Sequence, residues 1–172
     1  MVGIPSTTYC RGQGGGSPPS ERASLEDELM ERVVDVAPAC RVIRSVDEYQ
    51  GKQGPSYAGG ITAESVGSQA IWLGMVTMPP GSRTRAHLHD GHETAFYVLS
   101  GECDLWYGED LQDHEVARAG DYIYIPAGIS HVAVNRSLSE SFVVVGGRTD
   151  PSEQESVRLQ PELDDKVPST ST

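Results

Sequence analysis

The chain of 172 residues carries 13 lysines and arginines against 25 aspartates and glutamates, a formal net charge of −12 at pH 7. Nucleic acid and anionic membrane surfaces are therefore not expected partners, because both bind clustered basic residues. No apolar run approaches the roughly 20 residues that cross a bilayer, and residues 1–20 lack the layout of a secretory signal.

The three cysteines, Cys10, Cys40 and Cys103, are odd in number and far apart in the sequence. This spacing is typical neither of a disulfide framework nor of a zinc knuckle. We therefore expect ordinary thiols and a cytoplasmic protein, since disulfides persist chiefly in oxidising compartments.

The N-terminal region divides into two expected segments. Residues 1–23 are rich in glycine, proline and serine, a composition that buries too little apolar surface to offset the entropy of ordering, so we expect a disordered arm. Over residues 24–37 the pattern changes: Ser24 can cap a helix, and apolar residues recur at helical spacing up to Val33. Pro38 ends this predicted short helix.

Beyond Cys40 the helical period disappears, and short runs rich in valine, isoleucine and aromatic residues are divided by glycine, proline and asparagine. Many such runs in succession indicate an antiparallel sandwich or barrel. The predicted strands cover residues 41–44, 56–64, 69–78, 84–89, 94–107, 114–118, 121–125, 130–136 and 141–148. We therefore expect an all-β domain over residues 40–160 and a flexible tail over 161–172.

All five histidines lie between positions 87 and 131. His87 and His89 are two residues apart, so on a strand their side chains point to the same face and can converge on one ion. Glu93 follows after a glycine that can turn the chain, and His131 stands at the start of a later predicted strand. Imidazoles combined with one carboxylate suit iron, manganese, nickel or zinc.

The neighbours of these residues stand at regular intervals. Five residues separate Gly81 from His87, three separate His89 from Glu93, and seven separate Glu93 from Gly101. This order resembles the first motif of the cupin superfamily, which differs in having six residues before its final glycine. A second stretch runs over residues 120–135.

In that second stretch, Gly120, Pro126, Gly128, His131 and Asn135 match every interval of the second cupin motif. The glycines permit tight turns, and the Pro-x-Gly element bends the chain before the histidine.

The resemblance covers roughly residues 66–148 and implies a single-domain jelly-roll β-barrel, here with a short N-terminal helix and flexible termini. It implies a divalent transition metal, most readily Fe(II) and otherwise Mn, Ni or Zn, inside the wider mouth of the barrel. The implied ligands are His87, His89, His131 and Glu93. Single-domain cupins commonly pair, so a homodimer is also expected.

The sequence leaves the fourth ligand open. Counted back from Gly101, Thr94 occupies the usual glutamate position, and a one-residue slip on a strand reverses the face. Either a small bulge near Glu93 turns its side chain back toward the histidines, or His92, which lies on the same strand face as Thr94, takes its place as the fourth ligand. The third alternative is a three-histidine site completed by water.

Three or four protein ligands leave open positions on the metal, as in catalytic rather than closed structural sites. Our leading hypothesis is an enzyme that oxidises a small organic molecule with dioxygen, by analogy with other small cupins. The first alternative is a non-redox isomerase, cyclase, decarboxylase or lyase, in which Glu93 or Tyr124 is the candidate catalytic group for proton transfer. The second alternative is a non-catalytic binding or sensing module.

Overall fold

The computed structural model describes residues 39–44, 46–152, 154 and 156–168. The chain divides into two units, residues 1–40 and 41–172. The expected arm over residues 1–23 and the expected helix over 24–37 lie outside the described residues, so the description that follows concerns the second unit.

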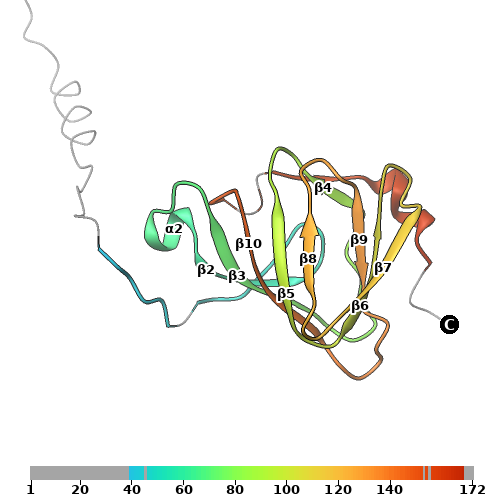
Figure 1. The fold of residues 1–172 in the computed structure, drawn as a ribbon, viewed down its shortest axis with the longest axis horizontal. Coiled ribbons are helices and arrows are strands. Elements are labelled where there is room, and N and C mark those ends of the chain that lie inside the picture. The colour runs from blue at the N-terminus through green and yellow to red at the C-terminus, as the bar shows by residue number, and fades with distance from the viewer. Residues whose placement is uncertain (1–38, 45, 153, 155, 169–172) are drawn as a thin grey trace, which may run out of the picture. The chain divides into compact units, whose positions relative to one another are not determined.

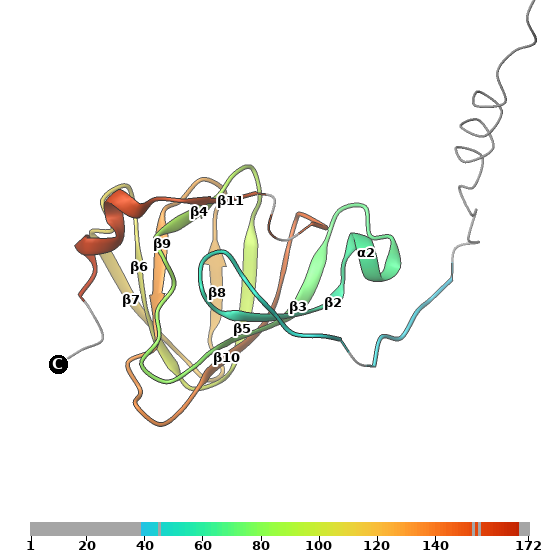
Figure 2. The ribbon, with the colours of Figure 1, turned by 180° about the vertical axis from the view of Figure 1, so that it is seen from behind.

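Two antiparallel sheets face each other and enclose the interior, so the expected all-β jelly-roll barrel is confirmed (Figures 1 and 2). The six-stranded sheet has the order β1 (Tyr49–Gln50), β2 (Ser56–Ile61), β3 (Trp72–Met78), β10 (Phe142–Arg148), β5 (Thr94–Ser100) and β8 (Tyr122–Ile125). The five-stranded sheet has the order β11 (Val157–Leu159), β4 (His87–His89), β9 (His131–Val134), β6 (Glu102–Tyr107) and β7 (Asp113–Arg118). A short helix, α2 (Ala63–Val66), and a 3-10 helix, η1 (Pro161–Lys166), complete the described elements.

Three of the differences from the expected strand boundaries have a direct structural cause. Residues 41–44 form no strand, because no neighbouring segment pairs with them. The predicted strand over 56–64 ends at Ile61, where α2 begins after the capping residue Thr62. The run over 94–107 divides into β5 and β6 at Gly101, whose φ of 80° lies in the left-handed region that favours glycine.

The main core fills the space between the sheets. Alternate residues of β3 and β10 point inward, among them Trp72, Val76 and Val144, and Cys103 of β6 meets them from the opposite sheet. This period-two alternation is what the sequence pattern predicts for strands with one buried face.

The outer face of the five-stranded sheet is covered by the C-terminal segment. Leu163 and Val167 pack with Val132 and Val134 of β9, so β9 is buried on both faces. Residues 161–168 therefore differ from the expected flexible tail: they form η1 and pack onto the barrel through their apolar side chains.

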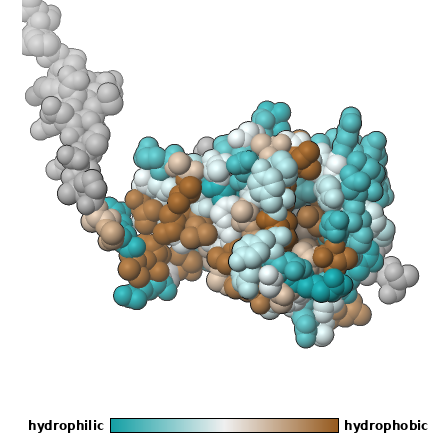
Figure 3. Space-filling model, viewed as in Figure 1, coloured by the Kyte–Doolittle hydropathy of each residue, from teal (hydrophilic) through white to brown (hydrophobic). Residues whose placement is uncertain are grey.

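The outer face of the six-stranded sheet stays open and carries apolar side chains, including Leu73, Met75 and Leu99, which are 43 to 46% exposed. Figure 3 shows hydrophobic residues gathered over the part of the molecule that carries α2 and β2. The expected homodimer stays a prediction. Within the described part of the chain, no helix has the length and apolar character to cross a membrane.

Candidate metal centre

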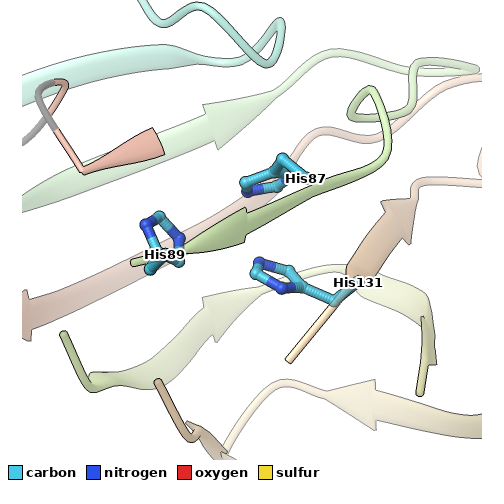
Figure 4. A group of neighbouring side chains, drawn as sticks. All are labelled: His87, His89 and His131. Carbon is cyan, nitrogen blue, oxygen red and sulfur yellow. The ribbon is translucent and has the colours of Figure 1, made fainter. Parts of the chain in front are cut away.

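Three histidines from two neighbouring strands meet inside the barrel (Figure 4). His87 and His89 lie two residues apart on β4, and His131 begins β9 directly opposite His87 in the ladder. One nitrogen of each ring lies within 4.8 Å of those of the other two, and the residues are only 2 to 4% exposed. The structure thus brings together three of the four predicted ligands.

Backbone carbonyls orient two of the three rings. The Nδ1 of His87 donates to the carbonyl oxygen of Arg85 at 2.8 Å, and the Nδ1 of His131 donates to that of Ile129 at 2.9 Å. A proton held at Nδ1 leaves Nε2 with a free lone pair, which is the form that binds a metal. The loop of the second motif also reaches β4, because the amide of Gly128 donates to the carbonyl oxygen of His89 at 2.8 Å.

Burial keeps all three imidazoles neutral. It lowers the pKa of His89 to about 2 and that of His131 to about 4, and it places the pKa of His87 well below the usual value. The positive charge of Arg148 lowers each pKa further. Because a metal competes with protons for the same lone pairs, this neutral set fits a divalent cation near pH 7.

Glu93 is not part of this group, contrary to the first of the expected alternatives. It lies just before β5 and is exposed, and its carboxylate accepts a hydrogen bond from the Tyr124 hydroxyl at 2.6 Å. The next residue, Thr94, is 1% exposed and points inward, as the register count from Gly101 indicated. The ladder of β5 with β8 is regular from Thr94 onward, so no bulge turns the carboxylate toward the histidines.

His92 does not join the group either. Its Nδ1 lies 3.6 Å from a carboxylate oxygen of Asp150, and its side chain is partly exposed. Among the described residues, the group that could hold an ion therefore contains the three histidines alone, which is the residue set of the third expected alternative.

Tyr124, the other predicted catalytic residue, is 60% exposed and points away from the barrel interior. Its hydrogen bond to Glu93 raises its pKa. The structure therefore does bring Tyr124 and Glu93 together at the outer surface; neither lines the interior cavity of the histidines, although Tyr124 and His131 both line an outer groove.

The histidines line a small interior cavity of about 50 Å³. Its other walls are mostly apolar and include Phe96, Leu105 and Ile125. Cys103 also lines it, and burial raises the pKa of this thiol to about 12, so the thiol is neutral at pH 7. This volume admits roughly three or four water-sized groups.

A larger groove of about 640 Å³ lies against the other side of the His131 wall, between residues of β7 and β8. These are the last strands of their sheets, so the groove follows the gap between two sheet edges. It shares four lining residues with the interior cavity, namely Leu105, Ile123, Ile125 and His131. The groove and the interior cavity therefore share a wall that includes His131.

Arg148 is a member of the cavity wall that sequence reasoning did not single out. It follows Phe142, Val144 and Gly146 in the inward alternation of β10, and it is 3% exposed. Its guanidinium lies near the rings of Tyr57 and Trp72, 5.7 and 5.6 Å from their centroids. In the predicted strand over residues 141–148, alternate residues share one face, and this alternation could have shown from the sequence that Arg148 lies on the inward face.

Comparison with protein families gives a match to the cupin domain over residues 74–146. No curated protein matches the sequence.

Solved structures that resemble this one have the same double-stranded β-helix fold. Oxalate decarboxylase from Bacillus subtilis is 17% identical with a TM-score of 0.60, over 92% of this chain and 42% of that chain. The polyketide cyclase RemF from Streptomyces resistomycificus is 21% identical with a TM-score of 0.58, over 77% of this chain and 95% of that chain. A conserved Klebsiella pneumoniae protein with a double-stranded β-helix domain is 18% identical with a TM-score of 0.53, over 72% and 97% of the two chains. At such identities the likeness shows the fold.

Proposed function

We propose that this protein of the cupin superfamily is a metal-dependent enzyme that acts on a small organic molecule. The observation that carries the proposal is the convergence of three buried, neutral histidines on one face of β4 and β9. A structural ion would be closed by four protein ligands, whereas three ligands in a cavity leave positions open for substrate.

The metal we propose is iron(II). A set of imidazoles without a carboxylate suits iron, nickel, copper or zinc better than manganese, which prefers oxygen ligands. When bound, iron(II) would supply redox chemistry toward dioxygen and a positive charge beside the substrate. The reaction we propose is therefore an oxygen-dependent, dioxygenase-type oxidation.

The protein residues orient the ligands and exclude water. The carbonyl groups of Arg85 and Ile129 hold two imidazoles in the ligand tautomer. The apolar side chains of Phe96, Leu105 and Ile125 separate the cavity from bulk solvent. A cavity of low polarity strengthens every charge interaction within it and limits side reactions with water.

The experiment is to purify the protein without a histidine tag and without air, determine its metal content, load it with iron(II) and record oxygen uptake. A panel of phenols, diketones and thiols provides the substrates. We expect iron-dependent uptake with at least one class, and its loss in H131A. Iron-loaded protein that consumes no oxygen with any of them would contradict the oxidation.

A non-redox reaction is the second candidate. It is favoured by the likeness in fold to structures described as an oxalate decarboxylase and a polyketide cyclase. In that case the ion would polarise a carbonyl group, and zinc would serve as well as iron. Turnover that persists with zinc and without air would select this candidate over oxidation.

A further inference from the structure

Arg148 places a positive charge in the cavity of the three histidines. The histidines belong to the five-stranded sheet, whereas Arg148 ends β10 in the six-stranded sheet, and both sides line the same cavity of about 50 Å³. Its side chain lies in the wall of the same cavity as the three imidazoles. An arginine at the inward position of a central strand is unusual, because charged residues are almost never fully buried unless paired.

Neighbouring side chains hold the guanidinium in place. The rings of Tyr57 and Trp72 lie within 6 Å of it, a distance at which aromatic faces attract cations. Gln53, which is fully buried, donates a hydrogen bond to the Tyr57 hydroxyl and so fixes that ring. A ligand that binds the guanidinium therefore does not have to order it first.

Among the described residues that line the cavity there is no aspartate or glutamate, whereas Arg148 is one of them. Imidazole binds a metal as a neutral ligand, so the three histidines would compensate none of the two positive charges of the ion. Arg148 adds a third positive charge, and the buried Asp150 supplies one negative charge that acts on it. Glu93, the carboxylate expected to balance the metal, lies outside the cavity. In a medium of low dielectric constant such an excess of positive charge favours an anionic ligand.

We propose that Arg148 is a specificity-determining residue that binds a carboxylate group of the substrate beside the metal. This inference rests on the proposed metal centre and narrows the substrate class to small organic acids. A guanidinium matches a carboxylate with two parallel hydrogen bonds. The small volume of the cavity suits a carboxylate head group.

Calorimetric titration of zinc-loaded protein at pH 7 tests the proposal, because zinc fills the site without redox turnover. The two probes are acetate and acetamide, which have nearly the same shape and differ in charge. We expect wild-type protein to bind acetate at least about tenfold more tightly than acetamide, as charge-assisted hydrogen bonds are about twice as strong as neutral ones. Equal affinity for the two probes would overturn the proposal.

Two variants assign the preference to the arginine. R148M removes the guanidinium but leaves the Asp150 carboxylate buried, which can prevent folding. The double variant R148M/D150N removes both charges together and avoids that problem. We expect it to keep its zinc and to bind acetate about 10- to 100-fold more weakly than wild type, with a smaller preference over acetamide that comes from the zinc ion alone.

The matched control is R118M, because Arg118 is an exposed arginine of β7 that pairs with Glu102 on the surface. It should bind acetate as wild type does. If R148M/D150N holds zinc and binds acetate as tightly as wild type, Arg148 serves only to pair Asp150 and the inference fails. Zinc content separates the two proposals: protein that binds no metal refutes the metal centre, whereas protein that binds metal but shows no arginine-dependent acetate binding refutes only the role of Arg148.

Discussion

Hydrogen bonds from Nδ1 to backbone carbonyl groups hold two imidazole rings of the candidate centre in the form that binds a metal through Nε2. His87 and His131 each commit Nδ1 to the carbonyl oxygen of the residue two positions earlier, Arg85 and Ile129. Such outer bonds fix the tautomer and the ring plane, and they raise the basicity of the free nitrogen. Little reorganisation is then needed when an ion binds.

Replacing His87, His89 or His131 singly with alanine should empty the site. Each variant leaves two ligands in a buried cavity, too few to compensate for the hydration that a divalent ion loses. Plasma emission spectrometry of purified protein should show the metal content fall from about one ion per chain to a small fraction of that. H114A is the control, because His114 lies on β7 and bonds Asp104 at 2.9 Å, outside the group. Unchanged metal content in all three variants would refute the centre.

The variants E93Q and H92A should retain the metal. The Glu93 side chain bonds Tyr124 on the outer surface, and His92 lies beside Asp150, so neither reaches the histidine group. A chelator competition assay should give metal affinities close to that of wild type. A loss of about tenfold or more in either variant would make that residue a ligand or a close support of one.

The sequence predicted some of these residues better than others, for a physical reason. His131 lies in a stretch that matches every interval of the second cupin motif, so the resemblance located it. The inward face of Thr94 depends on the register of β5 with β8, and spacing to Gly101 gave the right parity but could not exclude a bulge at Glu93. Arg148 was missed because a charge at an inward position contradicts the usual alternation.

At the scale of elements, the strand that carries two of the ligands depends on the C-terminal segment. β4 has only three residues and pairs with β9 at a single position, His87 with His131. On its other side β11 pairs with it along its whole length, and η1 follows directly. Arg83 bonds the carbonyl oxygens of Asp164 and Val167, and Asp164 accepts a hydrogen bond from the amide of Ala86 at 2.7 Å.

We expect L163A to weaken both the fold and the metal site. Leu163 is 7% exposed and packs beneath η1 against Val132 and Val134, so truncation leaves a cavity there. Such losses cost about 2 to 5 kcal/mol of unfolding free energy. Urea unfolding measures the stability, and chelator competition measures the metal affinity, which should fall as β4 loosens.

The control for this prediction is L138A, since Leu138 is 83% exposed and packs against no core cluster of the described residues. It should leave both quantities nearly unchanged. A destabilised L163A that binds metal with wild-type affinity would show that β4 does not depend on η1.

The C-terminal elements escaped prediction because their order comes from distant partners. Residues 150–166 are acidic and lack a long apolar run. The bonds that hold η1 join residues about 80 positions apart, such as Arg83 with Asp164. Residues 41–44 show the opposite case: their apolar and basic pattern favours a strand, but no strand of the described residues pairs with them. Local pattern therefore gave the paired central strands and failed where tertiary contacts decide.

At the scale of the whole molecule, the chain is negatively charged, whereas the cavity wall carries the positive charge of Arg148. The chain has a formal net charge of −12, yet the cavity combines a buried arginine with a cation site. A negative surface attracts metal cations and repels organic anions over distances up to about a Debye length, near 8 to 10 Å. Selection for an anionic substrate would therefore depend on Arg148 within the cavity and not on long-range steering.

Acid should destabilise the metal-free protein, and the sign follows from the histidines. Their folded pKa values lie below the ordinary 6.5, at about 2 for His89 and about 4 for His131. Between these values and 6.5 the unfolded chain binds more protons than the folded one, so stability falls as pH falls. From pH 7 to pH 5 the expected loss is about 2 kcal/mol per histidine, in a range above the titration of most carboxylates. Urea unfolding of chelator-treated protein at both pH values measures it, and H131Q should show a loss smaller by one histidine. Equal stability at pH 7 and pH 5 would mean that the three rings are not held neutral by burial.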